Sequence, residues 1–164
     1  MEINGIAHIQ LTVNDLARCM VFYEKLLTHF GMTVVVRSRK GLYCIGGRTA
    51  IAVTRSSEAN RDTASDQRRI GLHHICFRAR SREDIDEVYE FLPEIGAKVI
   101  HPPEEGPWFP GYYSLLFEDP DGIRLEVNHV PGEGYLGAEI GSKILHGAKL
   151  PLDIFPGFQD YPDA

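Results

Sequence analysis

The chain has 164 residues, 43% of them hydrophobic and 24% charged, which is typical of a folded globular protein and argues against disorder. Its formal net charge of −6 comes without the clustered Lys and Arg that a phosphate backbone rewards, so we expect a small-molecule partner and no nucleic acid. It has no apolar run long enough to span a bilayer and no signal-peptide pattern at its start, so we expect no membrane association and a cytoplasmic location.

The first segment predicts a strand, a helix and three further strands. The helix follows an N-cap at Asn14-Asp15, buries one face, and ends at about Phe30 before Gly31. Gly46-Gly47 forms a hairpin turn between the last two strands. The predicted strands cover residues 6–13, 33–37, 42–45 and 50–54. We take residues 4–55 as a first module.

A polar stretch with almost nothing to bury follows at 56–70 and is predicted to be a surface linker. The second module, 71–130, repeats the order of the first. Ser81 with Asp84 caps a helix that Pro93 and Gly96 end, and its buried face carries apolar side chains. These apolar side chains are Ile85, Val88, Tyr89 and Leu92.

The strands of the second module are predicted at 72–79, 98–101, 112–117 and 123–129. The last two are joined by Asp119-Pro120-Asp121-Gly122, and we interpret its two aspartates as turn formers. Residues 131–164 match neither module and are predicted to be a C-terminal tail. The three cysteines have no close pair, which favours buried thiols over disulfides.

Both modules open with the same motif. Gly5-Ile6-Ala7-His8 begins the first, and Gly71-Leu72-His73-His74 begins the second, which indicates an internal duplication. A histidine stands at the same place in each copy. The last strand of the second module adds Glu126, and two histidines with one carboxylate can hold a divalent metal while leaving positions open for substrate.

The alternation of side chains along a strand places these three residues on polar faces. His8 shares its face with Gln10, His74 shares its face with Cys76, and the apolar neighbours take the opposite faces. By the same register, His73 points toward the helix. We therefore predict that His8, His74 and Glu126 converge in a cleft and bind one metal ion, whose identity (Fe, Mn, Ni or Zn) stays open.

With these residues in place, the chain resembles the vicinal oxygen chelate superfamily, which contains glyoxalase I, extradiol dioxygenases, and fosfomycin- and bleomycin-resistance proteins. The resemblance covers about 4–130 and rests on His8, on Phe22-Tyr23, on the repeated Gly-x-x-His motif, and on the run from Phe117 to Glu126. It implies a single α+β domain at 4–130, with two tandem βαβββ modules forming an open, cupped mixed sheet around a central metal cleft. It also implies a homodimer, and exposed sheet edges give a physical reason for pairing.

Departures from the subfamilies limit the reaction. Glyoxalase I uses a fourth ligand where this chain has Ala52, so the usual base beside the metal is absent. Extradiol dioxygenases place a Tyr where Leu116 stands, with Tyr112 as a displaced substitute. The loop from Glu105 to Gly111 does not match the expected phosphonate-binding loop of the fosfomycin-resistance enzymes.

The sequence therefore favours a metal-dependent enzyme of isomerase or lyase type that acts on a small oxygen-chelating substrate. Two alternatives stay open: a ferrous extradiol-type dioxygenase, and a metal-free protein that binds small molecules such as drugs. We predict catalytic roles for Glu126 and Tyr112. The predicted substrate-binding residues are Gln10, Arg78, Trp108 and Arg124.

Overall fold

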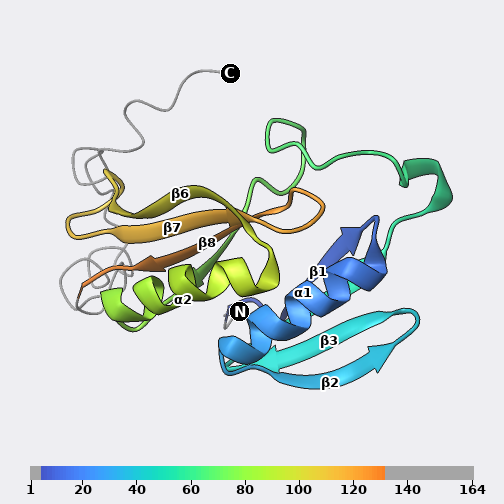
Figure 1. The fold of residues 1–164 in the computed structure, drawn as a ribbon, viewed down its shortest axis with the longest axis horizontal. Coiled ribbons are helices and arrows are strands. Elements are labelled where there is room, and N and C mark those ends of the chain that lie inside the picture. Colours follow the sequence, from blue (N-terminus) through green and yellow to red (C-terminus); the bar gives the residue numbers. More distant parts are fainter. Residues whose placement is uncertain (1–4, 132–164) are drawn as a thin grey trace, which may run out of the picture. The chain divides into compact units, whose positions relative to one another are not determined.

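The computed structural model of the chain describes residues 5–131, and residues 1–4 and 132–164 lie outside the described part. The predicted tail is therefore described only at Pro131. Figure 1 shows the elements, which follow in the order β1 (His8–Val13), α1 (Leu16–His29), β2 (Thr33–Ser38), β3 (Gly41–Gly46), β4 (Thr49–Arg55), a short 3-10 helix η1 (Glu58–Asn60), β5 (Ile75–Arg78), α2 (Arg82–Ile95), β6 (Lys98–Glu105), β7 (Tyr113–Glu118) and β8 (Arg124–His129).

The strands form two four-stranded sheets with equivalent strand order. The first sheet runs β1-β4-β3-β2 and the second runs β5-β8-β7-β6. In each, the strand that opens the module pairs in parallel with the strand that closes it, β1 with β4 and β5 with β8. Because one arrangement occurs twice, the predicted α+β fold of two tandem βαβββ modules is confirmed.

The described residues separate into two compact units. The first unit contains residues 5–73, 92–98 and 118–124, and the second contains 74–91, 99–117 and 125–131. The turn between β7 and β8 therefore belongs to the unit that carries the first sheet. The domain and module limits given above stay predictions.

Helix α1 covers one face of the first sheet, where it contacts β2, β3 and β4. The carboxylate of Asp15 caps its start by accepting a hydrogen bond from the backbone N–H of Arg18 at 3.1 Å. Gly31 follows its end with φ +75°, a conformation that favours glycine. The side chains that α1 buries are Leu16, Cys19, Phe22, Tyr23, Leu26 and Leu27. The predicted helix is confirmed. Of the core face predicted at Leu16, Met20, Tyr23 and Leu27, all but Met20 are buried, and Met20 is half-buried.

Helix α2 begins with the predicted capping box. The Ser81 hydroxyl accepts from the Asp84 backbone N–H at 3.2 Å, and the Asp84 carboxylate accepts from the Ser81 N–H at 2.9 Å. Two details of the prediction are wrong. Tyr89 is 41% exposed and lies beside the buried stripe. Pro93 lies inside the helix, which ends at Ile95, because in the last turn a proline removes a single backbone hydrogen bond.

Two strands of the second sheet differ in length from the prediction. Strand β6 continues through Pro102 and Pro103 to Glu105, because it is the edge strand of the sheet and an edge tolerates residues without an N–H. Strand β5 is shorter and begins at Ile75, where its pairing with Leu125 of β8 starts. His74 therefore lies immediately before the strand.

The turn between β7 and β8 is held by a buried aspartate. Asp119 is 4% exposed, and its carboxylate accepts hydrogen bonds from the backbone N–H groups of Asp121 and Ile123 at 2.9 and 2.8 Å. Its other oxygen accepts from the hydroxyl of Tyr23 on α1 at 2.8 Å. The predicted turn is confirmed, and Asp119 also joins it to the helix of the first module.

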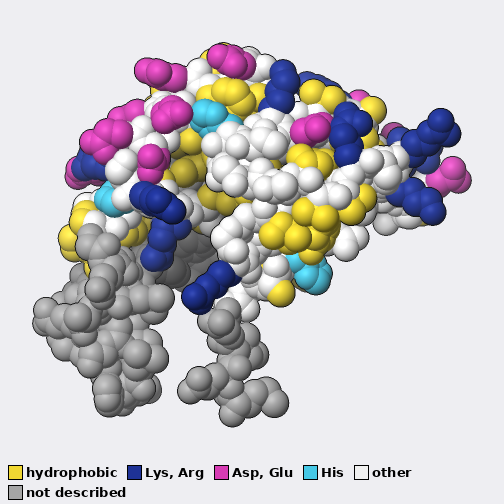
Figure 2. Space-filling view, turned by 90° about the horizontal axis from the view of Figure 1, so that it is seen from below, with side chains coloured by type: hydrophobic (Ala, Val, Ile, Leu, Met, Phe, Trp, Pro, Cys, Tyr) yellow, Lys and Arg dark blue, Asp and Glu magenta, His cyan; other side chains and the backbone are white. Residues whose placement is uncertain are grey.

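The outer surface of α2 is strongly acidic. Its acidic residues are Glu83, Asp84, Asp86, Glu87, Glu90 and Glu94, and two of them lie in the first turn, where the helix dipole favours negative charge. Figure 2 shows one face of the molecule with acidic side chains gathered at the upper left.

Within the described residues, no helix has the length and apolar character needed to cross a membrane.

Candidate functional site

Three of the predicted site residues meet on β8 and beside it. Glu126 lies in the middle of β8 and is 8% exposed. One carboxylate oxygen, Oε2, lies 3.1 Å from Nε2 of His74, and the other, Oε1, accepts a hydrogen bond from the Tyr112 hydroxyl. The second unit thus brings His74, Tyr112 and Glu126 into direct contact.

The surroundings of Glu126 favour its charged form. Burial alone would raise its pKa, but the hydrogen bonds from His74 and Tyr112 and the charge of His74 outweigh burial and lower the pKa. Burial and the adjacent Glu126 raise the pKa of Tyr112 well above its ordinary value. The cluster therefore pairs an ionised carboxylate with a phenol that keeps its proton and acts as a donor.

Cys76 lies on the same face of the second sheet and is the register partner of Glu126. The prediction of three buried thiols is wrong here, because Cys76 is exposed whereas Cys19 and Cys44 are buried. Partial loss of water around the thiol, together with the charge of Glu126, raises its pKa. Since the thiolate is the nucleophilic form, this cysteine is poorly suited to covalent chemistry.

The third predicted ligand, His8, belongs to the first unit. It begins β1, its side chain is exposed, and it pairs in register with Ala50 of β4. Two residues along, Gln10 pairs with Ala52. His8 and Gln10 share the sheet face opposite the buried side chains that meet α1.

The two registers explain the difference between the modules. In the first module, Gln10 stands two residues after His8 and pairs with Ala52. In the second module, Cys76 stands two residues after His74 and pairs with Glu126. Ala52 therefore occupies the position that corresponds to the carboxylate. Among the residues that the structure describes, no three His, Cys, Asp or Glu side chains form a ready metal-binding group. The His74–Glu126 pair is the part of the predicted triad that is in contact.

The predicted substrate-binding residues have different surroundings. Arg78 is exposed on β5, and Trp108 is half-buried in the loop before β7. The guanidinium Nε of Arg124 lies 3.5 Å from Glu118, whose other oxygen lies 2.9 Å from Lys98 Nζ. His73, which was predicted to point toward the helix, is exposed, so that prediction is wrong.

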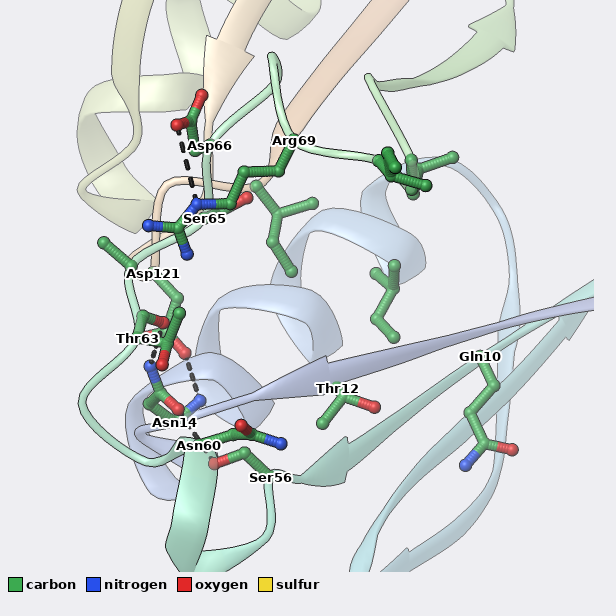
Figure 3. A pocket seen from close by; sticks show the side chains of 16 residues that line it. Gln10, Thr12, Asn14, Ser56, Asn60, Thr63, Ser65, Asp66, Arg69 and Asp121 are labelled. Atoms are coloured by element: carbon green, nitrogen blue, oxygen red, sulfur yellow. Dashed lines mark hydrogen bonds and ion pairs between the residues drawn. The ribbon is translucent and has the colours of Figure 1, made fainter.

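A cavity of about 380 Å³ lies in the first unit (Figure 3). It is bounded by the end of β1, the linker and the turn before β8, and its lining includes Gln10, Thr12, Asn14, Arg69 and Asp121. The Asn14 side chain donates to the Thr63 carbonyl at 3.0 Å and accepts from the Ser56 hydroxyl at 2.8 Å, while its backbone N–H donates to Asp121.

The sequence predicted the linker as a plain surface segment and missed this cavity. The signal in the sequence was the Ser, Thr and Asn content of the linker, since these side chains form hydrogen bonds to nearby backbone groups and so order a loop. Gln10 reaches the cavity wall and also donates to the Thr54 hydroxyl at 3.2 Å.

The fold agrees with a comparison with known families. Residues 5–127 match the family described as the Glyoxalase/Bleomycin resistance protein/Dioxygenase superfamily. The chain belongs to this superfamily. A member of known structure from Frankia, a glyoxylase/bleomycin resistance protein/dioxygenase domain, is 27% identical with a TM-score of 0.65, covering 82% of this chain and 97% of that one.

Three further proteins are similar to this chain. The uncharacterized protein YqjT of Bacillus subtilis is 28% identical, with 73% of this chain and 94% of that protein covered. The metallothiol transferase FosB of Staphylococcus epidermidis is 27% identical, with 78% and 83% covered. The lactoylglutathione lyase of Agrobacterium tumefaciens is 22% identical with a TM-score of 0.59, covering 79% and 96%, and this likeness shows the fold alone.

Proposed function

We propose that the protein is a divalent-metal-dependent enzyme that acts on a small oxygen-chelating substrate, with an isomerase or lyase type of reaction. His74 and Glu126 would hold the metal together with His8. The observation that carries this proposal is the 3.1 Å approach of His74 Nε2 to Glu126 Oε2, at a carboxylate that is 8% exposed.

The chemistry of the donors fits a metal ion. An imidazole nitrogen and a carboxylate oxygen that point at one another are common ligands of first-row divalent metals, and a buried carboxylate is stabilised by a positive charge beside it. His8 enters the proposal through the duplication, since it stands where His74 stands in the other module. The same face as His8 carries Gln10, which lines the cavity of the first unit and supports a role in substrate contact.

A bound divalent metal would supply Lewis-acid stabilisation for the negative charge that develops on a chelated substrate oxygen. This chain's residues would do the remaining work. Tyr112 keeps its proton and donates to Glu126. Ala52 stands where glyoxalase I has its fourth ligand, which is the usual base beside the metal. A reaction of isomerase type would therefore need a proton acceptor from another side chain.

The name of one relative supports an enzyme that handles a metal. That relative is named a metallothiol transferase, and the activity belongs to that protein. For this chain the name favours a metal-dependent enzyme over the metal-free binding protein. The ferrous dioxygenase is an alternative to be tested with a catechol panel.

The direct test measures the metal content of the full chain purified without added metal, in the wild type and in His74→Ala. We expect the wild type to retain close to one equivalent of a divalent metal and the variant to lose most of it, because the imidazole supplies one of three ligands. His101→Ala is the matched control. His101 also stands beside a glutamate, with Nδ1 3.5 Å from Glu104 Oε1, but both side chains are exposed on edge strand β6.

Equal metal content in the wild type and His74→Ala would contradict the assignment. A wild type that contains no metal and takes up none from Mn²⁺, Zn²⁺, Ni²⁺ or Fe²⁺ would favour the metal-free binding protein. Oxygen uptake by the anaerobically Fe²⁺-loaded protein with a catechol would instead select the dioxygenase.

A further inference from the structure

We propose that Tyr112 is a positioning residue that decides which oxygen of Glu126 is offered to the metal. This inference rests on the proposed function, because it concerns the presentation of one of its ligands. The loop before β7 would thereby set the geometry of the metal site without touching the metal.

The contacts of the carboxylate carry the first step. Oε1 accepts from the Tyr112 hydroxyl, while Oε2 is the atom that lies 3.1 Å from His74 Nε2. A carboxylate can bind a metal through one oxygen or through both. Because Oε1 accepts the hydrogen bond from Tyr112, Glu126 has only Oε2 free to bind the metal. Oε2 is the oxygen that faces His74.

The second step concerns how firmly the phenol is held. Tyr112 is 6% exposed, and its backbone closes a compact loop: its N–H donates to the Phe109 carbonyl at 2.9 Å, and its own carbonyl accepts from the Gly106 N–H at 2.9 Å. A Cβ on residue 106 would stand 3.1 Å from the indole of Trp108 and 3.2 Å from the ring of Tyr112. An alanine there would be tight against both rings, which would have to give by a few tenths of an ångström.

The third step separates this role from ordinary packing. The next residue, Tyr113, also donates its hydroxyl to a carboxylate, Asp86 Oδ1 of α2, at 2.8 Å. Its ring packs under the Arg82 guanidinium at 4.0 Å, on the face of the sheet that α2 covers. Tyr112, just before β7, and Tyr113, at its start, thus each donate a hydroxyl hydrogen bond to a carboxylate, the first buried and the second exposed. One supports a helix, and the other supports the predicted ligand.

The experiment titrates metal-free full-length protein with Co²⁺, followed by its visible absorption, in the wild type, Tyr112→Phe and Tyr113→Phe. Loss of a residue that orients a metal ligand typically weakens binding by about 10- to 100-fold. We expect that loss for Tyr112→Phe, together with a shifted Co²⁺ spectrum, because Oε1 becomes free to bind. Tyr113→Phe should keep the wild-type affinity and spectrum.

Gly106→Ala provides a second variant, which keeps the hydroxyl and crowds the rings of Trp108 and Tyr112. We expect it to weaken Co²⁺ binding in the same direction and by less than Tyr112→Phe. Thermal unfolding of the metal-free proteins identifies any variant that fails to fold. If Tyr112→Phe binds Co²⁺ within twofold of the wild type with an unchanged spectrum, the positioning role is wrong while the metal site stands. If the wild type binds no Co²⁺, the proposed function itself fails.

Discussion

At the residue scale, buried carboxylates have opposite surroundings in the two units. Glu126 accepts side-chain hydrogen bonds from His74, Tyr112 and Ser114, and together with the charge of His74 they outweigh its burial, so its pKa is lowered. Asp119 also accepts several hydrogen bonds, yet burial dominates there and raises its pKa. Glu126 thus favours the charged form that a cation would bind, whereas Asp119 holds the turn before β8 through its hydrogen bonds.

The raised pKa of Asp119 predicts a pH dependence of stability. The folded protein holds this proton more tightly than the unfolded chain, whose aspartate has a pKa of about 3.9. Ionisation of Asp119 therefore costs folding free energy as pH rises through the interval between the two pKa values, by about 1.4 kcal/mol for each unit that separates them. Asp119→Asn removes this cost and keeps oxygen and amide groups for the turn.

We expect the unfolding free energy of Asp119→Asn, relative to the wild type, to increase from pH 4 to pH 7 in urea titrations. Asp62→Asn, in the exposed linker, is the control and should follow the wild type across that range. A relative stability of Asp119→Asn that is flat or declines with rising pH would show that burial does not dominate at this carboxylate.

Residue identities in the candidate site were only partly predictable. The alternation along β1 correctly placed Gln10 with His8 on one face, because strand periodicity depends on local sequence alone. The Tyr112–Glu126 hydrogen bond was not foreseen, since it joins a loop to a strand across the sheet. Exposure of Cys76 was missed for the same reason: an apolar sequence context does not specify what covers a side chain.

At the element scale, the start of α2 has a strong local determinant. The Ser81 hydroxyl and the Asp84 carboxylate satisfy each other's backbone N–H groups. Ser81→Ala should therefore lower the unfolding free energy by about 1 kcal/mol, as for other N-cap serines. Urea denaturation followed by far-ultraviolet circular dichroism measures this change.

Ser57→Ala is the matched control. Ser57 precedes η1, but its side chain makes no capping bond to that helix, and its hydroxyl accepts from the exposed amide of Asn60 at 3.2 Å. We expect this change to stay within about 0.5 kcal/mol of the wild type. Equal losses in the two variants would mean that the Ser81 cap does not stabilise α2.

Helices and turns were predicted well, whereas strand ends were not. The residues that start and end a helix, such as Asp15 and Gly31, are its neighbours in the sequence, so the local sequence reveals them. Strand ends depend on the partner strand. β6 extends across Pro102 because it lies at an edge, and β5 is short because its ladder with β8 begins at Ile75. Neither fact is present in the local sequence.

At the scale of the whole molecule, the first sheet leaves apolar side chains uncovered on the face opposite α1. Val36 is 49% exposed and Ile45 is 44% exposed, and register places Val36 beside Tyr43 and Ile45 beside Ala50 on that face. Exposed apolar groups on a sheet with open edges favour association. His8 and Gln10 lie on this same face, so a contact here would border the predicted metal site. The homodimer that the family resemblance implies stays a prediction.

If this face is the dimer contact, Ile45→Lys should weaken association by about tenfold or more, because burying a lysine in place of an isoleucine forfeits about 1.5–3 kcal/mol of apolar burial. Analytical ultracentrifugation should give twice the 18.4 kDa chain mass for the wild type and a large monomer fraction for the variant.

Val21→Lys is the control. Val21 is 48% exposed on α1, on the other side of the same sheet, where a lysine suits the helix and should leave the dimer intact. A dimer that withstands Ile45→Lys but dissociates with Val21→Lys would place the contact on the helix instead.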